Sequence, residues 1–344
     1  MSTLATNAIT DAAGGNTATI NGYTPTESNM AGRNRIINGD MRIDQRNAGA
    51  SVTPAQDNFI VDRFKWGHSQ ASKFTSQQST TAPAGFTNSL LLTVTSAVTL
   101  GASDYFSAYQ PVEGFNVADL AWGTASAQAV TLSFKVRSSL TGTFGGAFRN
   151  ASGTRSYPFA YTISAANTFE DKTITIPGDT AGTWLTNNGV GLYLQFSLGV
   201  GTTYSGTAGA WASANYLSVT GAVSVVGTSG ATFYITGVQL EAGSAATPFE
   251  RRLYGQELAL CQRYYIRDEN LVVWMYAPHA LSSNYTRTTV FLPTTMRANP
   301  TVSVVMTGPA AGGIQGITPN MFTPYNNAQT QSAHIANYTA SAEL

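Results

Sequence analysis

The chain has 344 residues, which is long enough for two domains and a sizeable hydrophobic core. Charged residues make up only 10% of it, and the 18 lysines and arginines balance the 18 aspartates and glutamates. This neutral balance argues against nucleic acid as a partner, because phosphate binding requires a clustered positive field.

Residues 1–33 predict an extended N-terminal arm. The segment is small, polar and turn-prone, with Gly14, Gly15 and Pro25 among few large apolar residues. Such a composition cannot form a core of its own. We expect the arm to become ordered on a partner or on neighbouring copies of the chain, and a disordered leader is the alternative.

The composition changes at residues 33–49, RNRIINGDMRIDQRNAG, where isoleucines and charged residues become frequent. Its isoleucines and Met41 predict a pair of strands interrupted at Asn38-Gly39, which is a strong hairpin or bulge signal. A further strand is predicted at 58–66, with Asp62 and Arg63 inside it. Buried charges must be paired to be tolerated, so we expect these two residues to fix a corner of the fold.

Short strand signals then continue to about residue 240. In Val130–Arg137 the alternation of apolar and polar residues is strict, which is typical of a half-buried antiparallel strand. In the last strand a bulge at Gly237 would restore Val238 and Leu240 to the core face. Many short strands separated by turns predict a jelly-roll β-sandwich over residues 34–250. The predicted strands are 90–95, 105–110, 130–137, 157–163, 169–176, 190–196 and 233–240.

Residues 251–268 predict a linker helix. Tyr254, Leu258, Cys261 and Tyr265 recur at helical spacing and form one apolar stripe. A helix this short does not hold alone in water. The stripe is therefore expected to be an oligomer seam between identical chains, or to pack on the chain's own β-domains. Cys261, on that stripe, is expected to be a buried hydrophobic residue rather than a reactive thiol.

Residues 269–344 predict a second, smaller β-domain. Strand signals lie at 271–276, 288–292 and 301–306, followed by a stretch rich in glycine, proline and asparagine at 308–327 and a polar end at 333–344. The fold class is thus all-β: an arm, a sandwich, a short helix and a small β-domain.

No motif for catalysis is present. The three histidines, His68, His279 and His334, lack metal-ligand spacing, and one cysteine cannot anchor a zinc site. Phosphate-binding loops and nucleophile-elbow or metalloprotease motifs are missing. We therefore predict a protein that is not an enzyme and that needs no metal and no cofactor. No stretch approaches the ~20 apolar residues of a membrane span, and no secretory signal is recognisable, so no membrane insertion is expected.

Aromatic residues are the candidate ligand contacts. Trp122, Trp184 and Trp211 each lie in a loop-like stretch of small and polar residues, where a flat ring suits stacking against a sugar. Trp274 and Tyr276 form a second polar-tipped aromatic group in the C-terminal region. The alternative for each tryptophan is a plug that covers an end of the sandwich.

Several segments resemble a widespread family of bacteriophage tail fibre and tail-tip receptor-binding proteins. They are NTATINGYTP (16–25), RNRIINGDMRIDQRNAG (33–49), GVQLEAGSAATPFERRLYGQELALCQRYY (237–265), TTMRANPTV (294–302) and ASAEL (340–344). The matches occur in order along the chain, which makes them specific together. The region from about 67 to 230 carries none of them.

The resemblance implies a homotrimeric virion protein, assembled in the host cytoplasm. Its arm would dock on a tail or baseplate protein, a carbohydrate-binding-module-like jelly roll would follow, and the distal β-domain would face the host. The predicted function is host attachment by glycan binding without catalysis. The alternative is a purely structural fibre, connector or head or collar decoration protein, and an enzyme that degrades surface polysaccharide is a distant third.

Overall fold

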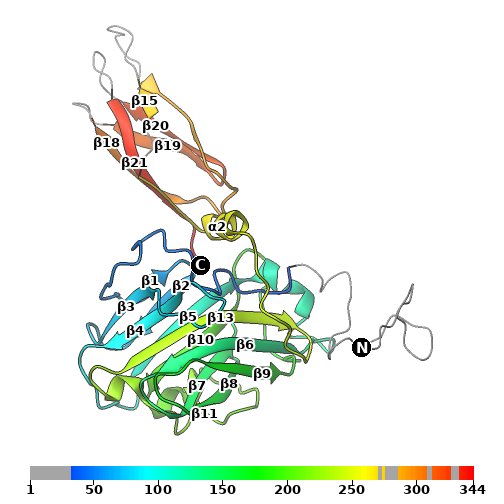
Figure 1. Cartoon of the computed structure of the whole chain (residues 1–344). Helices are drawn as coiled ribbons and strands as arrows, with labels where there is room; N and C mark the ends of the chain where they lie inside the picture. The colour runs from blue at the N-terminus through cyan, green and yellow to red at the C-terminus, as the bar shows by residue number, and fades with distance from the viewer. Residues whose placement is uncertain (1–31, 270–272, 276–285, 308–311, 327–332) are drawn as a thin grey trace, which may run out of the picture.

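The computed structural model describes residues 32–269, 273–275, 286–307, 312–326 and 333–344, so the arm at 1–31 lies outside the described residues. Figure 1 shows two β-rich bodies with the helix α2 (Tyr254–Gln262) between them. The larger body is a two-sheet sandwich and the smaller one is built from the C-terminal strands. The predicted all-β class, with a sandwich, a short helix and a smaller β-domain, is confirmed.

One sheet of the sandwich has six antiparallel strands in the order β1-β2-β5-β10-β7-β8. Its central strands β5 and β10 pair over most of their lengths, with Gln195 opposite Tyr109 and Ser197 opposite Ser107. The strands are β1 (Phe59–Val61), β2 (Phe64–His68), β5 (Tyr105–Glu113), β10 (Val190–Val200), β7 (Gly142–Arg149) and β8 (Ser156–Ile163).

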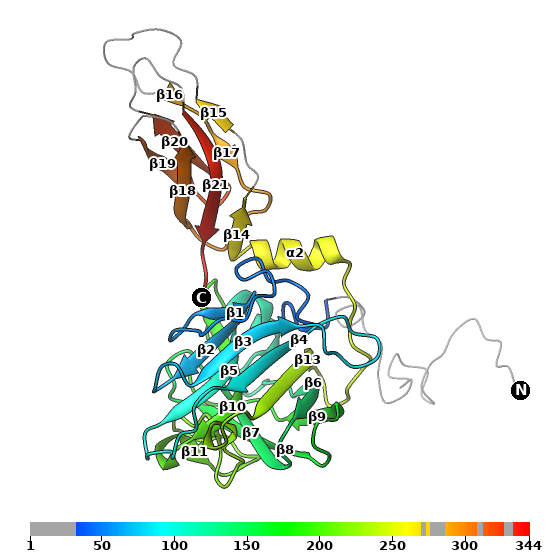
Figure 2. The same cartoon turned by 60° about the vertical axis from the view of Figure 1, so that its left-hand side comes forward.

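The second sheet has five antiparallel strands in the order β3-β4-β13-β6-β9. The apolar faces of the two sheets enclose one large core that includes Phe134, Phe196 and Phe233, all at most 2% exposed. Figure 2 shows the strands of this sheet side by side. They are β3 (Phe74–Ser79), β4 (Ser89–Val94), β13 (Thr232–Ala242), β6 (Val130–Ser138) and β9 (Glu170–Ile176).

Short elements lie in the connections of the sandwich. A parallel pair, β11 with β12, contacts the six-stranded sheet at β7, β8 and β10. The single-turn helices occur before β6, after β10 and before β13. These elements are η1 (Gly114–Asn116), η2 (Ala118–Leu120), η3 (Thr202–Tyr204), β11 (Ser205–Gly206), β12 (Ser218–Val219) and η4 (Val225–Gly227).

The bulge in β13 is confirmed. Gly237 has φ +61°, and the register with β6 shifts between Thr236 and Gln239. Val238 and Leu240 are both fully buried as a result. A positive φ suits glycine, which has no Cβ to clash in the left-handed region.

The predicted strand pair at 33–49 is wrong. The segment 34–50 contains no strand, although Ile36 and Met41 are fully buried. Two backbone hydrogen bonds, Arg35 N to Leu240 O (2.8 Å) and Val238 N to Gly39 O (2.9 Å), join the segment to β13. The Asn34 side chain adds two more, because it accepts from Leu240 N (3.1 Å) and donates to Val238 O (3.0 Å). A Cβ on Gly39 would come within 2.1 Å of Val238 O, so only glycine fits there.

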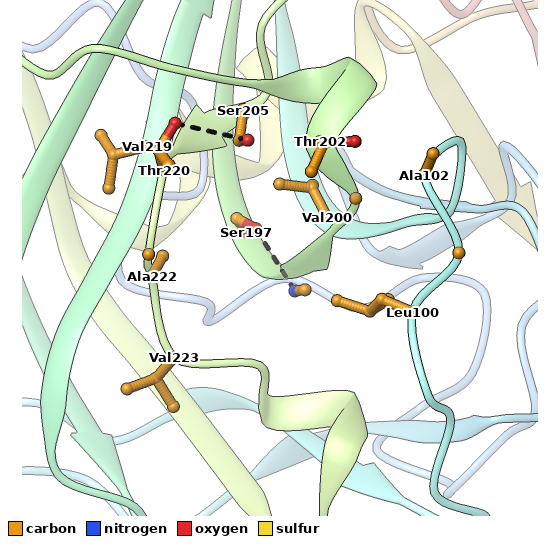
Figure 3. A pocket seen from close by; sticks show the side chains of 14 residues that line it. Leu100, Ala102, Ser197, Val200, Thr202, Ser205, Val219, Thr220, Ala222 and Val223 are labelled. Carbon is orange, nitrogen blue, oxygen red and sulfur yellow. Dashed lines mark hydrogen bonds between the residues drawn. The ribbon is translucent and has the colours of Figure 1, made fainter.

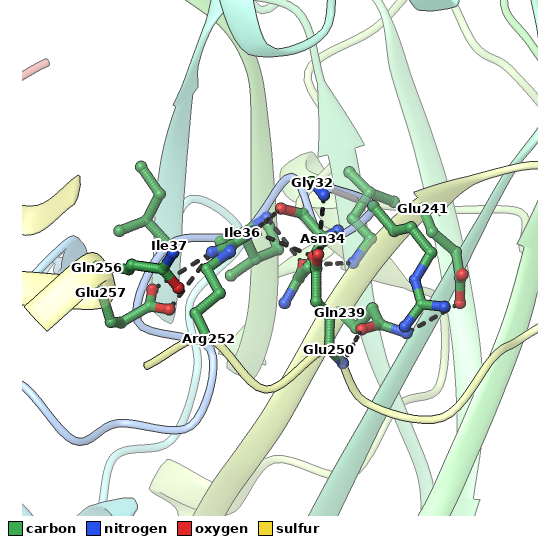
Figure 4. Close-up of polar contacts among 12 residues, drawn as sticks. Gly32, Asn34, Ile36, Ile37, Gln239, Glu241, Glu250, Arg252, Gln256 and Glu257 are labelled. Carbon is green, nitrogen blue, oxygen red and sulfur yellow. Dashed lines mark hydrogen bonds and ion pairs between the residues drawn. The ribbon is translucent and has the colours of Figure 1, made fainter. Parts of the chain in front are cut away.

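The same segment contacts the stretch that leads into α2 (Figure 4). Glu250 accepts hydrogen bonds from Gly32 N (2.8 Å) and Asn34 N (2.7 Å). Glu257, on α2, accepts one from Asn38 N at 2.5 Å, and Arg252 donates to Ile36 O. Segments some 200 residues apart in sequence therefore form one hydrogen-bonded joint on the end of β13.

The helix α2 is shorter than the predicted 251–268. It ends at Gln262, and Tyr265–Asp268 forms strand β14, the first strand of the C-terminal body. The helix cannot continue because Tyr264 turns into a small core with Ile37, Ile43 and Cys261. The backbone of Tyr265 then pairs with Ser341.

The described part of the C-terminal body forms two small sheets, and its core includes the buried residues Phe322 and Ile335. In one sheet the central strand β21 pairs with β14, β15 and β18, and in the other β20 pairs with β16, β17 and β19. The strands are β15 (Val273–Met275), β16 (Thr286–Arg287), β17 (Val290–Phe291), β18 (Thr301–Thr307), β19 (Gly312–Thr318), β20 (Met321–Asn326) and β21 (Ala333–Ser341).

Asp62 and Arg63 lie in the tight turn between β1 and β2, where Arg63 has φ +70°. They pair with residues elsewhere in the chain rather than with each other. Asp62 Oδ1 lies 3.5 Å from Arg46 Nη1. Arg63 forms an ion pair with Glu343 and donates a hydrogen bond to Pro111 O at 2.8 Å. Both charges are 1% exposed, so this corner ties the sandwich to the C-terminal body.

Asp62 makes stability depend on pH. Burial raises the pKa of its carboxyl from 3.8 to about 6, although Arg46 and hydrogen bonds from Gln45 oppose the shift. Between about pH 4 and about pH 6 the folded protein keeps a proton that the unfolded chain has lost, so stability falls as pH rises through this window. Across this window the free energy of unfolding of the wild type is expected to fall by about 2–3 kcal/mol because of Asp62. Asp62→Asn should remove this dependence on pH.

The measurement is the free energy of unfolding of both proteins across this pH range. The advantage of Asp62→Asn over the wild type should grow with pH up to about pH 6 and then level off. Lost hydrogen bonds from Gln45 would add an offset that is constant with pH. The control is Asp171→Asn, since the Asp171 side chain is 76% exposed. Parallel profiles for the wild type and Asp62→Asn would contradict the prediction.

Candidate functional site

The three loop tryptophans of the sandwich come together. The ring centroids of Trp122 and Trp184 lie 4.8 Å apart, those of Trp122 and Trp211 5.3 Å, and those of Trp184 and Trp211 5.5 Å. All three pairs are close to perpendicular, which is a favoured aromatic geometry. We call these residues the tryptophan trio.

Each indole N–H of the trio donates to a backbone carbonyl. The acceptors are Gln128 O (2.8 Å), Ala181 O (3.1 Å) and Pro177 O (2.8 Å) for Trp122, Trp184 and Trp211 respectively. Trp122 is only 7% exposed and packs in the main core. Trp184 and Trp211 are half-buried.

An ion pair fixes the loops around the trio. Arg155 makes two hydrogen bonds to Asp179, at 2.8 and 2.6 Å, and a third to Ser213. Asp179 is 1% exposed. The trio therefore packs against the main core as a plug, and ligand binding by Trp184 and Trp211 stays a prediction.

Only part of the C-terminal aromatic group lies within the described residues. The backbone of Trp274 lies on β15 opposite His334 of β21. Its side chain and the whole of Tyr276 lie outside the described residues.

The four predicted seam residues do not share one exposed face. Tyr254 is 57% exposed, Leu258 is half-buried, and Cys261 is 1% exposed against Ile37 and Ile43. The guanidinium carbon of Arg46 lies over Tyr265, 3.5 Å from the centroid of the tyrosine ring. Part of the stripe thus packs on the chain itself, and the oligomer seam stays a prediction. Burial raises the pKa of the Cys261 thiol well above its usual value, as for a structural cysteine.

A more promising surface lies on the outer face of the six-stranded sheet. Along β5 and β10 alternate residues point into the core, among them Phe106, Leu192 and Leu194. The opposite parity places Tyr105, Tyr109 and Tyr193 on the outer face, since side chains alternate along a strand. Tyr204, at the end of η3, lies over the same face.

These tyrosines surround one arginine. The Arg149 guanidinium lies 5.1 Å from the ring centroid of Tyr193. Tyr109 and Tyr193 are 5.8 Å apart, and Tyr105 and Tyr204 are 5.4 Å apart, both pairs edge to face. We call Tyr105, Tyr109, Arg149, Tyr193 and Tyr204 the tyrosine surface. All except Tyr109, which is 8% exposed, are half-buried.

The groups around this surface are mostly neutral. Burial lowers the pKa of Arg149, and it raises the pKa of Tyr105, Tyr109 and Tyr193, so the phenols stay protonated. Arg149 Nη1 donates to Asn215 Oδ1 at 2.5 Å.

Asp57, at the edge of the tyrosine surface, already accepts a hydrogen bond from one of its tyrosines. The hydroxyl of Tyr109 donates to Asp57 Oδ1 at 2.5 Å.

Two buried polar atoms at this surface have no hydrogen-bond partner among the described residues. They are Arg149 Nε, a donor, and Gln195 Oε1, an acceptor. Gln195 is 3% exposed, lies between Tyr193 and Ser197 on β10, and donates through Nε2 to Ser107 Oγ at 3.1 Å. Buried polar atoms of this kind usually have partners, so both atoms are unsatisfied beneath the tyrosine surface.

A pocket lies at the end of β10 (Figure 3). Its lining includes Val200, the strand partner of Tyr105, and Ser205, which follows Tyr204. Its volume is about 310 Å³. Ser197, Thr202 and Ser205 supply hydroxyl groups, while Leu100 and Val223 supply apolar walls. The side chains that line it carry no charge, which suits a neutral polar ligand.

The sequence prediction missed the tyrosine surface. Tyr105 and Tyr109 were part of a predicted strand, but their partners Arg149 and Tyr193 lie on other strands of the sheet. A usable signal was present: the three strand tyrosines stand at outward-facing positions of strands whose alternate residues are apolar.

Among the described residues no group of three or more histidine, cysteine, aspartate or glutamate side chains could hold a metal ion. No helix in the part of the chain that the structure describes is long and apolar enough to cross a membrane.

Comparison with known proteins gives weak structural likenesses. No model of a known protein family matches the sequence, and no curated protein matches it. One similar structure is the enzymatically active domain of tailspike protein 4 from bacteriophage CBA120, with a TM-score of 0.34 and 12% identity over 61% of this chain. The match spans 21% of that tailspike chain.

Carbohydrate-binding proteins are among the other similar structures. A putative sugar binding protein from Bacteroides thetaiotaomicron has a TM-score of 0.34 and 10% identity, with 61% of this chain and 100% of that chain covered. A family 11 carbohydrate-binding module from Clostridium thermocellum has a TM-score of 0.29 and 12% identity, with 58% and 98% covered.

Proposed function

We propose that this protein binds a glycan on the host cell surface, without catalysis, as part of a bacteriophage tail. The tyrosine surface carries the proposal. It combines half-exposed aromatic rings with a guanidinium group and with buried polar atoms that have no described partner. Sugars present apolar C–H faces and hydroxyl groups at once, and this pairing of ring and polar contact suits both.

Binding without bond cleavage fits the chemistry of the same surface. Glycoside hydrolysis needs two carboxyl groups about 5–9 Å apart. Two carboxylates near the tyrosine surface are already hydrogen-bonded. Asp57 accepts the hydroxyl of Tyr109, and Asp104, which precedes Tyr105, accepts from Ser69, Gln70 and Gly101.

The tail location rests on the resemblance of residues 16–25, 33–49 and 237–265 to phage tail fibre and tip proteins. With it we propose a homotrimer whose arm, 1–33, docks on a tail or baseplate protein, so that the chain is a virion component assembled in the host cytoplasm. Trp184 and Trp211 are proposed as a secondary glycan contact.

A purely structural role is the second candidate. It is favoured by the tryptophan trio, whose three N–H groups are all bonded to the backbone of the chain itself. In that case the aromatic residues of the sandwich would serve packing alone, and the protein would be a connector or decoration.

Tyr193→Ala separates the two candidates. Removal of a central aromatic contact typically costs about 2 kcal/mol, so glycan affinity should fall at least about tenfold. The measurement is binding of the purified protein to a glycan array, followed by titration of the glycans that bind.

The matched control is Tyr234→Ala. Tyr234 is half-buried on the five-stranded sheet and lies 4.9 Å from an arginine guanidinium, that of Arg137, so the two sites resemble each other locally. It should bind as the wild type does. Unchanged binding by Tyr193→Ala would refute the tyrosine surface as the site, and an array with no bound glycan would favour the structural role.

A further inference from the structure

We propose that the glycan bound at the tyrosine surface is acidic, and that Arg149 pairs with a carboxylate on it. This inference rests on the proposed function and adds the chemical class of the ligand.

Arg149 has no carboxylate partner among the described residues. Arg63 and Arg155 of the sandwich, and Arg263 after α2, are each paired with a carboxylate of the chain. Arg137 on β6 lies over a tyrosine and, like Arg149, forms no ion pair with a described residue. The contacts of Arg149 are an amide oxygen, Asn215 Oδ1, and the ring of Tyr193, and it forms no ion pair with any described residue. A half-buried cation surrounded by neutral groups is poorly compensated, because buried charges are normally paired.

The electrostatic surroundings do not supply the missing charge. Tyr105, Tyr109 and Tyr193 face Arg149, and burial raises the pKa of each phenol, so all three are neutral at ordinary pH. Lys65, next to Tyr109 in the sheet, adds positive charge, and burial lowers its pKa as it does that of Arg149. Asp57 is bonded to Tyr109 and lies at the edge of the surface.

The guanidinium of Arg149 has unused hydrogen-bonding capacity. Nη1 donates to Asn215 Oδ1, Nε is buried without a partner, and Nη2 forms no hydrogen bond with a described residue. Arginine binds carboxylates through two parallel hydrogen bonds, which are stronger than bonds to neutral acceptors. The tyrosine rings beside it would contact the sugar to which the carboxylate is attached.

The test uses pairs of glycans that differ only in charge. A glycan array carries uronic-acid oligosaccharides and, for each, its carboxyl-reduced neutral counterpart. The wild type is expected to bind acidic members at least about tenfold more tightly than their reduced counterparts, which is the usual gain from a charge-assisted hydrogen bond. This preference should decrease with added salt.

Arg149→Gln should abolish the preference, leaving affinity for acidic and reduced members equal, and Arg149→Lys should keep part of it. The matched control is Arg137→Gln, which removes an arginine that also lies over a tyrosine but on the five-stranded sheet. It should keep the preference of the wild type. The melting temperature of each variant shows whether it is folded.

The outcomes distinguish this inference from the proposed function. If the wild type binds reduced members as well as acidic ones, and Tyr193→Ala abolishes that binding, the site is a glycan site and the acidic class is wrong. If Arg149→Gln keeps the preference while folded, Arg149 is not the partner. If no glycan binds, the proposed function fails together with the inference.

Discussion

Replacement of Glu113 by alanine is expected to lower the free energy of unfolding by about 3–5 kcal/mol. Glu113 ends strand β5, and its side chain is fully buried. Arg263 donates two hydrogen bonds to it, at 2.6 and 3.0 Å, and the Tyr264 hydroxyl donates a third at 2.5 Å. Removal of the carboxylate leaves a cation and a hydroxyl without an acceptor at the joint.

The loss should affect the connection between the two bodies as well as the sandwich. Arg263 and Tyr264 follow directly after α2, and the carbonyl of Arg263 accepts a hydrogen bond from Arg297 N of the C-terminal body at 2.8 Å. We therefore expect Glu113→Ala to increase cleavage of the native protein by a protease near residues 262–269. Denaturant unfolding measures the stability, and limited proteolysis measures the joint.

Asp171→Ala is the control for Glu113→Ala. It also breaks an ion pair, with Lys135, but the Asp171 side chain is 76% exposed. Exposed ion pairs contribute about 0–1 kcal/mol, so little change is expected. A similar small change in both variants would show that Glu113 does not hold the joint.

The second large effect is expected for Trp122→Ala, which should cost about 3–5 kcal/mol of stability. Trp122 is 7% exposed, contacts both other members of the tryptophan trio, and lies 6.3 Å from the ring of Phe148. Its removal leaves a large cavity and takes away the donor to Gln128 O. The lost packing and the cavity both lower stability.

Trp184→Ala and Trp211→Ala are the comparison. Both rings are half-buried, so their removal exposes less new apolar surface and should cost less than that of Trp122. Thermal and denaturant unfolding of the three variants test the order. If Trp122→Ala costs no more than the other two, Trp122 is not the centre of the plug. If Trp184→Ala or Trp211→Ala weakens glycan binding while folded, the trio also contacts ligand.

Several elements could be read from local pattern because their burial follows strand periodicity. Apolar and polar residues alternate strictly in Val130–Arg137, and this segment forms strand β6. Its residues Val130, Leu132 and Val136 are fully buried. The bulge at Gly237 followed from the parity of Val238. These features depend on which face of one strand is apolar, and the order of residues along that strand determines this face.

Other strands could not be read in this way. Strand β7 contains Gly145 and Gly146, which are typical of a loop, but a Cβ on Gly146 would come within 2.2 Å of Gln195 O. Strand β21 lies in a stretch that we expected to be a polar end, and it is the central strand of its sheet. In both cases the neighbouring strands decide the conformation, and local composition does not reveal them.

The structural role of the segments that resemble phage tail proteins is visible only in the tertiary structure. Residues 33–49 and 237–265 meet in the joint, where Asn34, Glu250 and Glu257 form hydrogen bonds with partners far along the chain. In this chain, therefore, these two segments build the junction between sandwich, helix and C-terminal body. The tyrosine surface lies outside them.

By itself the sequence determined the all-β class, the position of most sandwich strands and the short helix, because periodicity and turn residues are local properties. It also identified the loop tryptophans, though not their mutual contact. Only the tertiary structure decided that Arg149 lies among four tyrosines, since these residues come from β5, β7, β10 and η3 and are brought together by strand order and register. Pairing between distant strands carries no local signature, and the candidate site is built from such pairing.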